Sequence, residues 1–517
     1  MVQAMKRFLN TAHGRRLLCL LSGAVFSLSY RVEWLFWLVF PCLTAFFLLD
    51  RPGEKGTFGR AYCFFAGFLM CLCTWFSSLY PLVAYGFSNA ESFLIAAFCC
   101  VVVPLLQALI DSALWLLTKR FPADRPLFRT IGVAALWTCT EWLLSVGELA
   151  FPWGQIALSQ TGFLPLVQTV SVFGVYGLTF AIVFVCALLA EGICGKKKPF
   201  LYGSASVLAS LLVLGTVLLA LPNKQDKQVS VALIQGNFAP EVQWDSDMTR
   251  ETYNVYLSMT EEAAANGAEL IILPESAVNV SFKAGSPLHL ALADIAEEYG
   301  CTILLGVLQT KEDGVHNGLV AVNPDHSISG VYEKRHLVPF GEFLPMEGFL
   351  MQFFPSLAEL NKTGSSLVSA ESSAVIASDA YTVGGFICFD SVFTGKDRAV
   401  PETDFSVVVT NDGWFKKSSG IYQHLRYSKL RAIESGKTLF RSANTGISAV
   451  IDPNGRILSE TEPMVREILY ADASYGNGTT LYSYIGNAFV PLCWGILLAL
   501  LLLDCKRHKK GVLHETA

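Results

Sequence analysis

Three short stretches in the second half of the chain carry side chains that together could form a thioester. Cys388 follows an apolar run, residues 383–387, whose composition favours an extended strand. A thiol at the end of a strand acts as a nucleophile when a base and a cation lie beside it. Glu275 and Lys334, each of which follows an expected strand, are candidates for that base and that cation. Taken alone, Cys388 could also be a buried core cysteine.

These residue types suit acyl transfer. A thiol with a pKa of ~8.5 is mostly protonated at neutral pH, and a neighbouring cation favours its thiolate. Glu275 can take the thiol proton and return it to a leaving group. The reaction passes through an oxyanion, which Lys334 and the backbone N–H of Phe389 could stabilise. A second nucleophile then resolves the thioester on Cys388, which gives ping-pong kinetics.

The three stretches resemble the nitrilase superfamily, whose triad of Glu, Lys and Cys occurs in this order. The resemblance extends to the apolipoprotein N-acyltransferase family, through blocks that follow or surround the candidate residues. These blocks are Leu337 to Phe343, Asn411 to Phe415, Gln423 with His424, Arg431 to Glu434, and Arg441 to Gly446. The resemblance implies a four-layer α-β-β-α sandwich and the catalytic residues Glu275, Lys334 and Cys388.

The same resemblance suggests further site residues. Glu342 matches an additional glutamate of the family, and its alternative role is a salt bridge that orders its loop. Asp390 stands where the family commonly has Glu, and Phe389 where it often has Tyr; both are expected to support the site. The candidates for substrate binding are Trp244, Phe343, Phe353 and Trp414, and packing is the alternative for the two tryptophans. His336 and His424 are interpreted as structural residues.

The composition indicates a membrane protein without nucleic-acid, metal or cofactor sites. Of 517 residues, 52% are hydrophobic and only 16% are charged, whereas globular domains average ~25% charged residues. The net charge of −5 gives no sign of nucleic-acid binding. Most of the 14 cysteines lie in apolar runs, and no cluster of Cys and His has the spacing of metal ligands. We therefore expect no metal and no cofactor.

Eight apolar runs are predicted to span a membrane, which requires ~20 apolar residues for each span. They cover residues 17–30, 33–49, 61–80, 93–117, 130–146, 166–190, 200–221 and 488–503. Clusters of Lys and Arg occupy alternate loops, and the opposite short loops carry only Arg31. By the positive-inside rule, both termini are cytoplasmic, and the segment after residue 222 is periplasmic in the inner membrane of a bacterium.

The chain is therefore predicted to combine a polytopic α-helical membrane domain with an extracytoplasmic α/β domain. Strand and helix patterns alternate after residue 229, which suits one α/β domain. The predicted division is a membrane domain at 1–222, a linker at 223–228, a catalytic domain at 229–484, a last membrane helix at 485–504 and a cytoplasmic tail at 505–517.

Three functions fit these observations. The resemblance implies a monomeric acyltransferase at the bilayer, with a phospholipid as acyl donor and a diacylglyceryl apolipoprotein as acceptor. A membrane-tethered amidase would use the same triad with water as the second nucleophile. A transporter or scaffold with an inactive domain is the third reading, but the intact Glu275, Lys334 and Cys388 argue against it.

Two further features are left open by the sequence. Asp111 and Glu141 lie within apolar runs, where carboxylates are candidates for functional sites, although they could also pair inside the bundle or lie near an interface. Residues 346–357 form an apolar segment directly after Glu342. Because exposed apolar patches usually mark interaction sites, this arm is predicted to dip into the membrane surface. A short amphipathic helix packed on the domain is the alternative.

Overall fold

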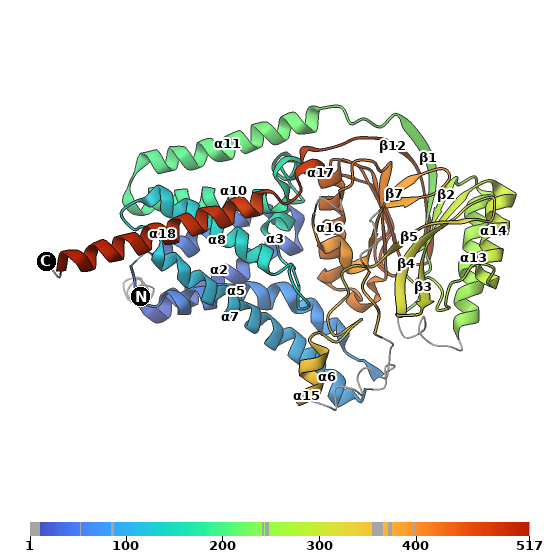
Figure 1. Cartoon of the computed structure of the whole chain (residues 1–517), viewed down its shortest axis with the longest axis horizontal. Coiled ribbons are helices and arrows are strands. Elements are labelled where there is room, and N and C mark those ends of the chain that lie inside the picture. The colour runs from blue at the N-terminus through green and yellow to red at the C-terminus, as the bar shows by residue number, and fades with distance from the viewer. Residues whose placement is uncertain are drawn as a thin grey trace, which may run out of the picture.

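The computed structural model describes residues 11–51, 53–83, 87–239, 242, 248–353, 366–370, 375–395 and 399–515. Trp244 lies outside the described residues, and for Phe353 only the backbone is described. A bundle of helices packs against a domain with two β-sheets, and the last helix, α18, returns along the bundle (Figure 1).

Helices cover the apolar segments of the first 220 residues and of the C-terminal region. They are α2 Ala12–Phe26, α3 Leu28–Arg31, η1 Glu33–Leu38, α4 Val39–Leu49, α5 Thr57–Leu72, η2 Cys73–Leu79, α6 Asn89–Ala97, η4 Phe98–Val102, α7 Val103–Trp115, η5 Leu116–Arg120, α8 Pro126–Leu143, η6 Ile156–Gln160, α9 Leu164–Val167, α10 Val170–Gly195, α11 Lys198–Ala220, α17 Leu481–Ile485 and α18 Phe489–Glu515. Small residues allow close packing in the bundle. A Cβ at Gly67 of α5 would lie 2.2 Å from the carbonyl oxygen of Leu20 in α2.

Several of these helices are long and apolar enough to cross a membrane. Among the described residues, four segments meet that condition: Thr57–Leu79, Asn89–Arg120, Val170–Gly195 and Lys198–Ala220. Shorter apolar helices cover Glu33–Leu49 and Phe489–Cys505. The chain therefore has several helices able to span a membrane, and the number eight stays a prediction.

The second domain contains two six-stranded sheets. The strands are β1 Lys227–Gln235, β2 Leu270–Ile272, β3 Thr302–Lys311, β4 Gly314–Val322, β5 Ile328–Glu333, β6 Val375–Ala377, β7 Thr382–Ile387, β8 Phe405–Thr410, β9 Leu439–Ala443, β10 Ala449–Ile451, β11 Ile457–Glu460 and β12 Glu467–Tyr475. The first sheet has the order β12-β1-β2-β3-β4-β5, and the second has the order β11-β10-β9-β8-β7-β6. The helices of this domain are α13 Thr249–Ala265, α14 Pro287–Tyr299, α15 Glu347–Phe353, η9 Cys388–Val392, η10 Asp412–Phe415 and α16 Ser419–Ser435.

Helices cover the outer faces of the two sheets. A core between the sheets contains Leu233, Leu304 and Val407, all fully buried. The first sheet packs on α13 and α14 through a second core, and the second sheet packs on α16 through a third. The observed layers agree with the α-β-β-α sandwich that the family resemblance implied.

Helix α16 has a second partner, because its other face contacts the helical bundle. Tyr427, Leu430 and Ile433 belong to the same apolar core as the membrane-domain helices. Nearly every residue of α16 is buried in consequence. The position of this helix between the second sheet and the bundle follows only from the packing of the two domains.

The secondary structure of the α/β domain was largely predictable. The pattern of polar and apolar residues predicts helices at 249–265 and 287–299 and strands at 382–387 and 405–410, and the structure has elements with these bounds. Strands β11 and β12 were not predicted. Strand β12 mixes polar and apolar residues without strict alternation, lies at the edge of the first sheet and pairs antiparallel with β1. Its partner, more than 200 residues away, could not be deduced from local pattern.

Candidate active site

The three predicted catalytic residues lie at strand ends and meet where the two sheets face each other. Glu275 follows β2 and Lys334 follows β5 in the first sheet, while Cys388 follows β7 in the second. Glu275 and Lys334 both act electrostatically on the Cys388 thiol, which places all three in one site.

Lys334 is fully buried between two carboxylates. Its Nζ donates to Glu275 Oε1 at 3.0 Å and to Glu342 Oε1 at 2.7 Å. Burial lowers the pKa of Lys334, but Glu275 and Glu342 outweigh burial, so its pKa lies well above the ordinary value. The lysine is therefore a permanent cation in this site.

Glu275 is a buried carboxylate whose two oxygens both accept hydrogen bonds. Oε1 accepts from Asn317 Nδ2 at 2.8 Å as well as from Lys334, and Oε2 accepts from the backbone N–H of Asn411 at 2.8 Å. These donors fix the orientation of the carboxylate, as a general base requires. Glu342 is fixed in a similar way, since its Oε2 accepts from the backbone N–H of Val338 at 2.8 Å.

Cys388 lies on a sharp turn between β7 and η9. Its φ angle of 49° falls in the left-handed region, which a residue with a side chain rarely adopts. Burial raises the pKa of the thiol above its ordinary value, Glu275 raises it further, and Lys334 lowers it. These effects favour the thiol over the thiolate, so nucleophilic attack by Cys388 would require a base to remove its proton.

Asp390 stabilises the loop around Cys388. Its side chain is fully buried; Oδ2 accepts from the Tyr332 hydroxyl at 2.5 Å, and Oδ1 accepts from the backbone N–H of His336 at 2.8 Å. The imidazole Nδ1 of His336 lies 3.0 Å from the same Oδ1. The carboxylate therefore joins the end of β5, the loop after Lys334 and the turn that carries the nucleophile.

A second polar network supports the same turn from α16. His424 Nε2 lies 3.2 Å from the carbonyl oxygen of Cys388 and 3.0 Å from Ser391 Oγ, and its Nδ1 lies 2.8 Å from Asp412 Oδ1. Arg441 donates to Asp412 Oδ2 at 2.6 Å. Burial opposes the charge of Asp412, but Arg441 and His424 lower its pKa below the ordinary value.

The Cys388, Asp412 and His424 ligand atoms lie within 4.8 Å of one another, as metal ligands can. In this structure both nitrogens of His424 and both oxygens of Asp412 take part in hydrogen bonds. The geometry therefore suits a hydrogen-bond network that positions the nucleophile, which agrees with the structural role expected for His424.

The structure describes the side chains of three further predicted site residues, Phe343, Phe389 and Trp414. Phe343 is half-buried and directly follows Glu342, and Trp414 is 37% exposed in η10, just after Asn411. Phe389 is buried and packs face to face on Phe151 of the helical bundle, with ring centroids 6.2 Å apart. The position of Trp244 and the side chain of Phe353 lie outside the described residues.

Sequence reasoning missed two groups that bind Glu275. Asn317 lies beside His316 in β4, whose other residues are apolar or glycine, and this pair of polar residues in a buried strand was an available signal. The second group is a backbone N–H, that of Asn411, which no side-chain motif can reveal. The family resemblance includes the block that contains Asn411, but it assigned no role to this residue.

Comparison with known proteins identifies the same two parts of the chain. The family profile for the carbon-nitrogen hydrolases matches residues 230–479, and that for the apolipoprotein N-acyltransferase N-terminal domain matches residues 22–188. An apolipoprotein N-acyltransferase of Gloeobacter violaceus is 32% identical over 443 residues, which cover 85% of this chain and 84% of that protein. One from Geobacter metallireducens is 29% identical over 500 residues, 92% of each chain. The chain belongs to the apolipoprotein N-acyltransferase family.

Proposed function

We propose that this protein transfers an acyl chain from a phospholipid to the N-terminal amino group of the diacylglyceryl-cysteine of apolipoproteins. The family membership supports this activity and makes hydrolysis of a simple amide the weaker alternative. The site supports a covalent route through Cys388, with Glu275 and Lys334 as its partners. The protein works as a monomer in this proposal.

In the first half-reaction, Glu275 takes the proton of the Cys388 thiol as the sulfur attacks the ester carbonyl carbon of the phospholipid. The negative charge that develops on the carbonyl oxygen is stabilised by Lys334 and by the N–H of Phe389. The ester C–O bond then breaks, and Glu275 returns its proton to the departing lysophospholipid oxygen. The product is a thioester on Cys388.

In the second half-reaction, the α-amino group of the apolipoprotein attacks the thioester carbonyl. Glu275 takes a proton from the amine and passes it to the sulfur of Cys388 as the C–S bond breaks. Glu342 holds Lys334 in place through its 2.7 Å ion pair. Trp414, Phe343, Phe353 and Trp244 are proposed to bind the substrates.

The observation that carries this proposal is the position of the nucleophile against the helical bundle. Phe389, Val392 and Phe393, which follow Cys388 in the turn, belong to the same apolar core as the bundle helices. A thiol held at this boundary suits a substrate whose reacting ester lies at the surface of a bilayer. An enzyme for soluble amides would not require this contact.

The proposed setting is the inner membrane of a bacterium, with both termini in the cytoplasm and the α/β domain in the periplasm. The alternation of basic loops supports this orientation. We also propose the domain division given above, with membrane segments at 1–222 and 485–504 around a catalytic domain at 229–484. Helix α11 ends at Ala220 and β1 begins at Lys227, so the last two residues of the proposed linker at 223–228 belong to β1.

The test is intact-mass analysis of the purified protein after incubation with phospholipid, followed by addition of a diacylglyceryl peptide. We expect one acyl adduct on the wild-type protein, its loss on addition of the peptide, and no adduct on Cys388→Ala. The matched control is Cys301→Ala, which removes another buried thiol of the same domain. Loss of the adduct to water as fast as to the peptide would favour the amidase instead.

A further inference from the structure

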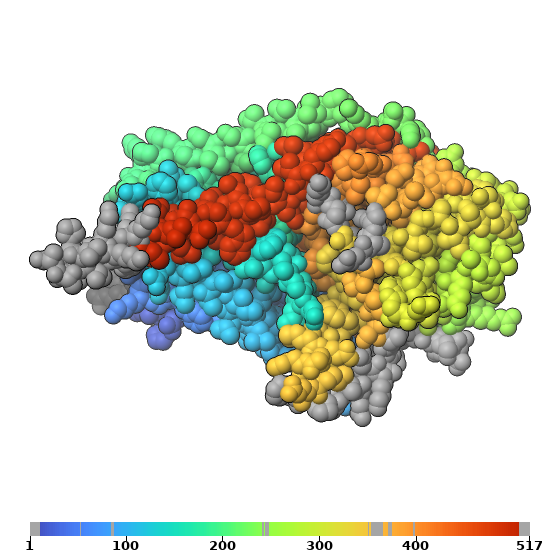
Figure 2. Space-filling model, viewed as in Figure 1, coloured from blue at the N-terminus to red at the C-terminus, as the bar shows by residue number. Residues whose placement is uncertain are grey.

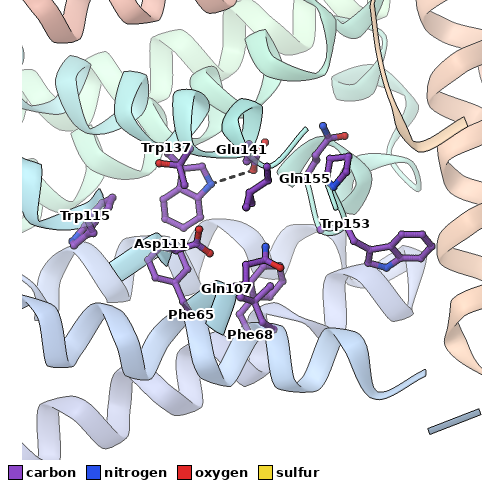
Figure 3. A pocket seen from close by; sticks show the side chains of 14 residues that line it. Phe65, Phe68, Gln107, Asp111, Trp115, Trp137, Glu141, Trp153 and Gln155 are labelled. Carbon is purple, nitrogen blue, oxygen red and sulfur yellow. Dashed lines mark hydrogen bonds between the residues drawn. The ribbon is translucent and has the colours of Figure 1, made fainter. Parts of the chain in front are cut away.

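A small cavity lies inside the helical bundle, where α5, α7, α8 and the loop after α8 meet (Figure 3). It encloses about 40 Å³, which is space for roughly three water molecules or for one small ion with water. The polar part of its lining consists of Gln107, Asp111, Thr140, Glu141 and Gln155.

The two carboxyl groups of the cavity have different surroundings. Glu141 accepts three hydrogen bonds: from Trp137 Nε1 at 3.1 Å, from the backbone N–H of Ile156 at 3.0 Å and from Thr179 Oγ1 at 2.7 Å. Three donors satisfy an ionised carboxylate. Glu141 is therefore arranged as the charged member of the pair.

Asp111 lacks comparable donors. The residue is 6% exposed, and its Oδ1 is buried without a hydrogen-bond partner among the described residues. Figure 3 shows its carboxyl group directed into the space between Trp137, Glu141 and Gln107. A second buried oxygen without a described partner, Gln155 Oε1, belongs to the same lining.

The lining contains no basic side chain to balance these carboxyl groups. Of the described bases on the adjoining helices, Arg60 of α5 pairs with Asp50 at 2.7 Å, and Arg129 of α8 pairs with Glu191. Helix α7 carries no Lys, Arg or His. Two uncompensated negative charges inside an apolar bundle are costly, so the cavity requires at least one positive charge.

We propose that this cavity binds one monovalent cation, a sodium ion or a proton, held by Asp111 opposite Glu141. A proton would make the Asp111 carboxyl a donor toward the cavity and leave Glu141 as the only charge. A sodium ion would be held by carboxylate oxygens and cavity water, and the volume allows either. Either cation would neutralise the Asp111 carboxylate inside this cavity.

The cation also stabilises the contact between the two domains in this proposal. Glu141 holds the loop after α8 through the N–H of Ile156. In that loop, Trp153 Nε1 donates to Gln423 of α16 at 2.6 Å, and the N–H of Gly154 donates to the Tyr427 hydroxyl at 3.1 Å. Repulsion between unneutralised carboxylates would therefore act on the loop beneath the catalytic domain.

The experiment uses the full-length protein in lipid nanodiscs. Thermal unfolding is followed while sodium chloride replaces choline chloride at constant ionic strength and neutral pH. For a sodium site, the Tm of the wild type rises with sodium, whereas Asp111→Asn does not respond. The matched control is Asp124→Asn, which removes a carboxylate that is 64% exposed on the same domain and should respond like the wild type.

Infrared spectroscopy of the same samples distinguishes the proton. If a proton is bound, the Tm is independent of sodium, and the wild type shows a protonated-carboxyl band that shifts in D₂O. That band disappears in Asp111→Asn and persists in Asp124→Asn. The proposal is wrong if the wild type shows neither a sodium response nor such a band, or if the band survives in Asp111→Asn. If Asp111→Asn folds poorly, the absence of both the sodium response and the band in the wild type still overturns the proposal.

Discussion

Lys334 sets the electrostatics of the catalytic site, because it is a fully buried cation between Glu275 and Glu342. Removing one member of a buried ionic group leaves the others uncompensated, at a cost of roughly 3–5 kcal/mol. The same cation lowers the pKa of the Cys388 thiol, while Glu275 raises it. The two residues therefore affect thiol reactivity in opposite directions, although the proposed mechanism uses both.

This opposition predicts a separation of two rates. In Glu275→Gln, alkylation of Cys388 by iodoacetamide should be as fast as in the wild type or faster, with its pH profile shifted to lower pH, because a charge that raises the thiol pKa is gone. Acyl transfer should fall by about 10²–10⁴-fold, since the proton acceptor is lost. In Lys334→Met, both rates should fall and the alkylation profile should shift to higher pH.

Alkylation is measured by mass spectrometry of the peptide that contains Cys388, with Cys388→Ala as the blank for the other thiols. Equal slowing of alkylation and acyl transfer in Glu275→Gln would contradict the role of Glu275 as a general base. Faster alkylation of Lys334→Met than of the wild type would contradict the effect assigned to the lysine.

Asp390 acts on the nucleophile through the loop that it holds. It accepts hydrogen bonds from Tyr332 and from the backbone of His336, and its side chain is fully buried. Asp390→Ala leaves those donors unpaired, at a cost of about 1–3 kcal/mol, and should lower kcat by about tenfold or more. The shape of the pH–rate profile should not change, because Asp390 carries no proton in the reaction.

The measurement is a pH–rate profile of Asp390→Ala beside Tyr332→Phe, which removes only the hydroxyl donor. We expect both variants to show a reduced plateau with unchanged pKa values. A shift of about one pH unit in the Asp390→Ala profile would instead identify the carboxylate as a titrating group.

At the scale of elements, the turn after β7 is stabilised from two sides. Asp390 links it to the loop after β5, and His424 links its backbone to α16. The left-handed backbone of Cys388 costs of order 1–3 kcal/mol and persists only where surrounding contacts over-determine it. The two networks supply those contacts and direct the thiol toward Glu275 and Lys334.

The segment after Glu342 contains the helix α15, so the short helix considered from the sequence is present. Its exposed residues include Met346, which is 43% exposed, and Phe349, which is 59% exposed. The backbone N–H of Met346 donates to Glu148 Oε2 in the bundle at 2.5 Å. In Figure 2 the gold segment that contains α15 projects from the surface. A segment that contacts the bundle through Met346 and exposes Phe349 suits contact with lipid.

We predict that Phe349→Ser raises the apparent KM for phospholipid about tenfold, which corresponds to ~1.4 kcal/mol. Burying a Phe side chain in the membrane surface contributes ~1.5–3 kcal/mol to binding, so the loss of this contact is large enough to produce the expected change in KM. The kcat and the alkylation rate of Cys388 should stay unchanged. The control is Leu290→Ser on α14, which removes an apolar side chain that is 46% exposed on the other side of the domain. An unchanged KM in Phe349→Ser would argue against the arm.

At the scale of the whole molecule, α16 joins the candidate active site to the helical bundle. Adjacent residues of this helix face the two partners: His424 contacts the Cys388 carbonyl, and Gln423 accepts a 2.6 Å hydrogen bond from Trp153 of the bundle. Lys429 adds a 2.9 Å ion pair to Glu33 of the bundle. The two domains are therefore expected to unfold together.

Trp153→Phe tests this coupling, because it keeps a ring and removes the donor to Gln423. Both residues are almost fully buried, so the unpaired amide oxygen should cost about 1–3 kcal/mol and lower the Tm by a few degrees. The measurement is thermal unfolding with Trp34→Phe as the control, since Trp34 is 70% exposed. A Tm equal to that of the wild type, or a second transition already present in the wild type, would contradict the coupling.

The sequence by itself predicted the residues of the candidate site and determined the two kinds of structure, apolar helices and an α/β domain. Glu275, Lys334 and Cys388 could be recognised because each lies in a short block next to a strand, and strands 382–387 and 405–410 follow from local composition. The apolar runs of the first 220 residues predicted helices because length and hydropathy are local properties. These features depend on residues that are close together in the chain, so local sequence patterns can predict them.

Only the tertiary structure decided which groups complete the site. The hydrogen bonds of Glu275 join residues 42 and 136 positions apart, and the contact from Trp153 to Gln423 spans 270 positions. The burial of α16 on both faces and the cavity around Asp111 likewise require two packed surfaces. The reason is physical: hydrogen bonds and desolvation depend on distances of a few ångströms, which are fixed when the sheets and helices pack together and not by the local preferences of either partner.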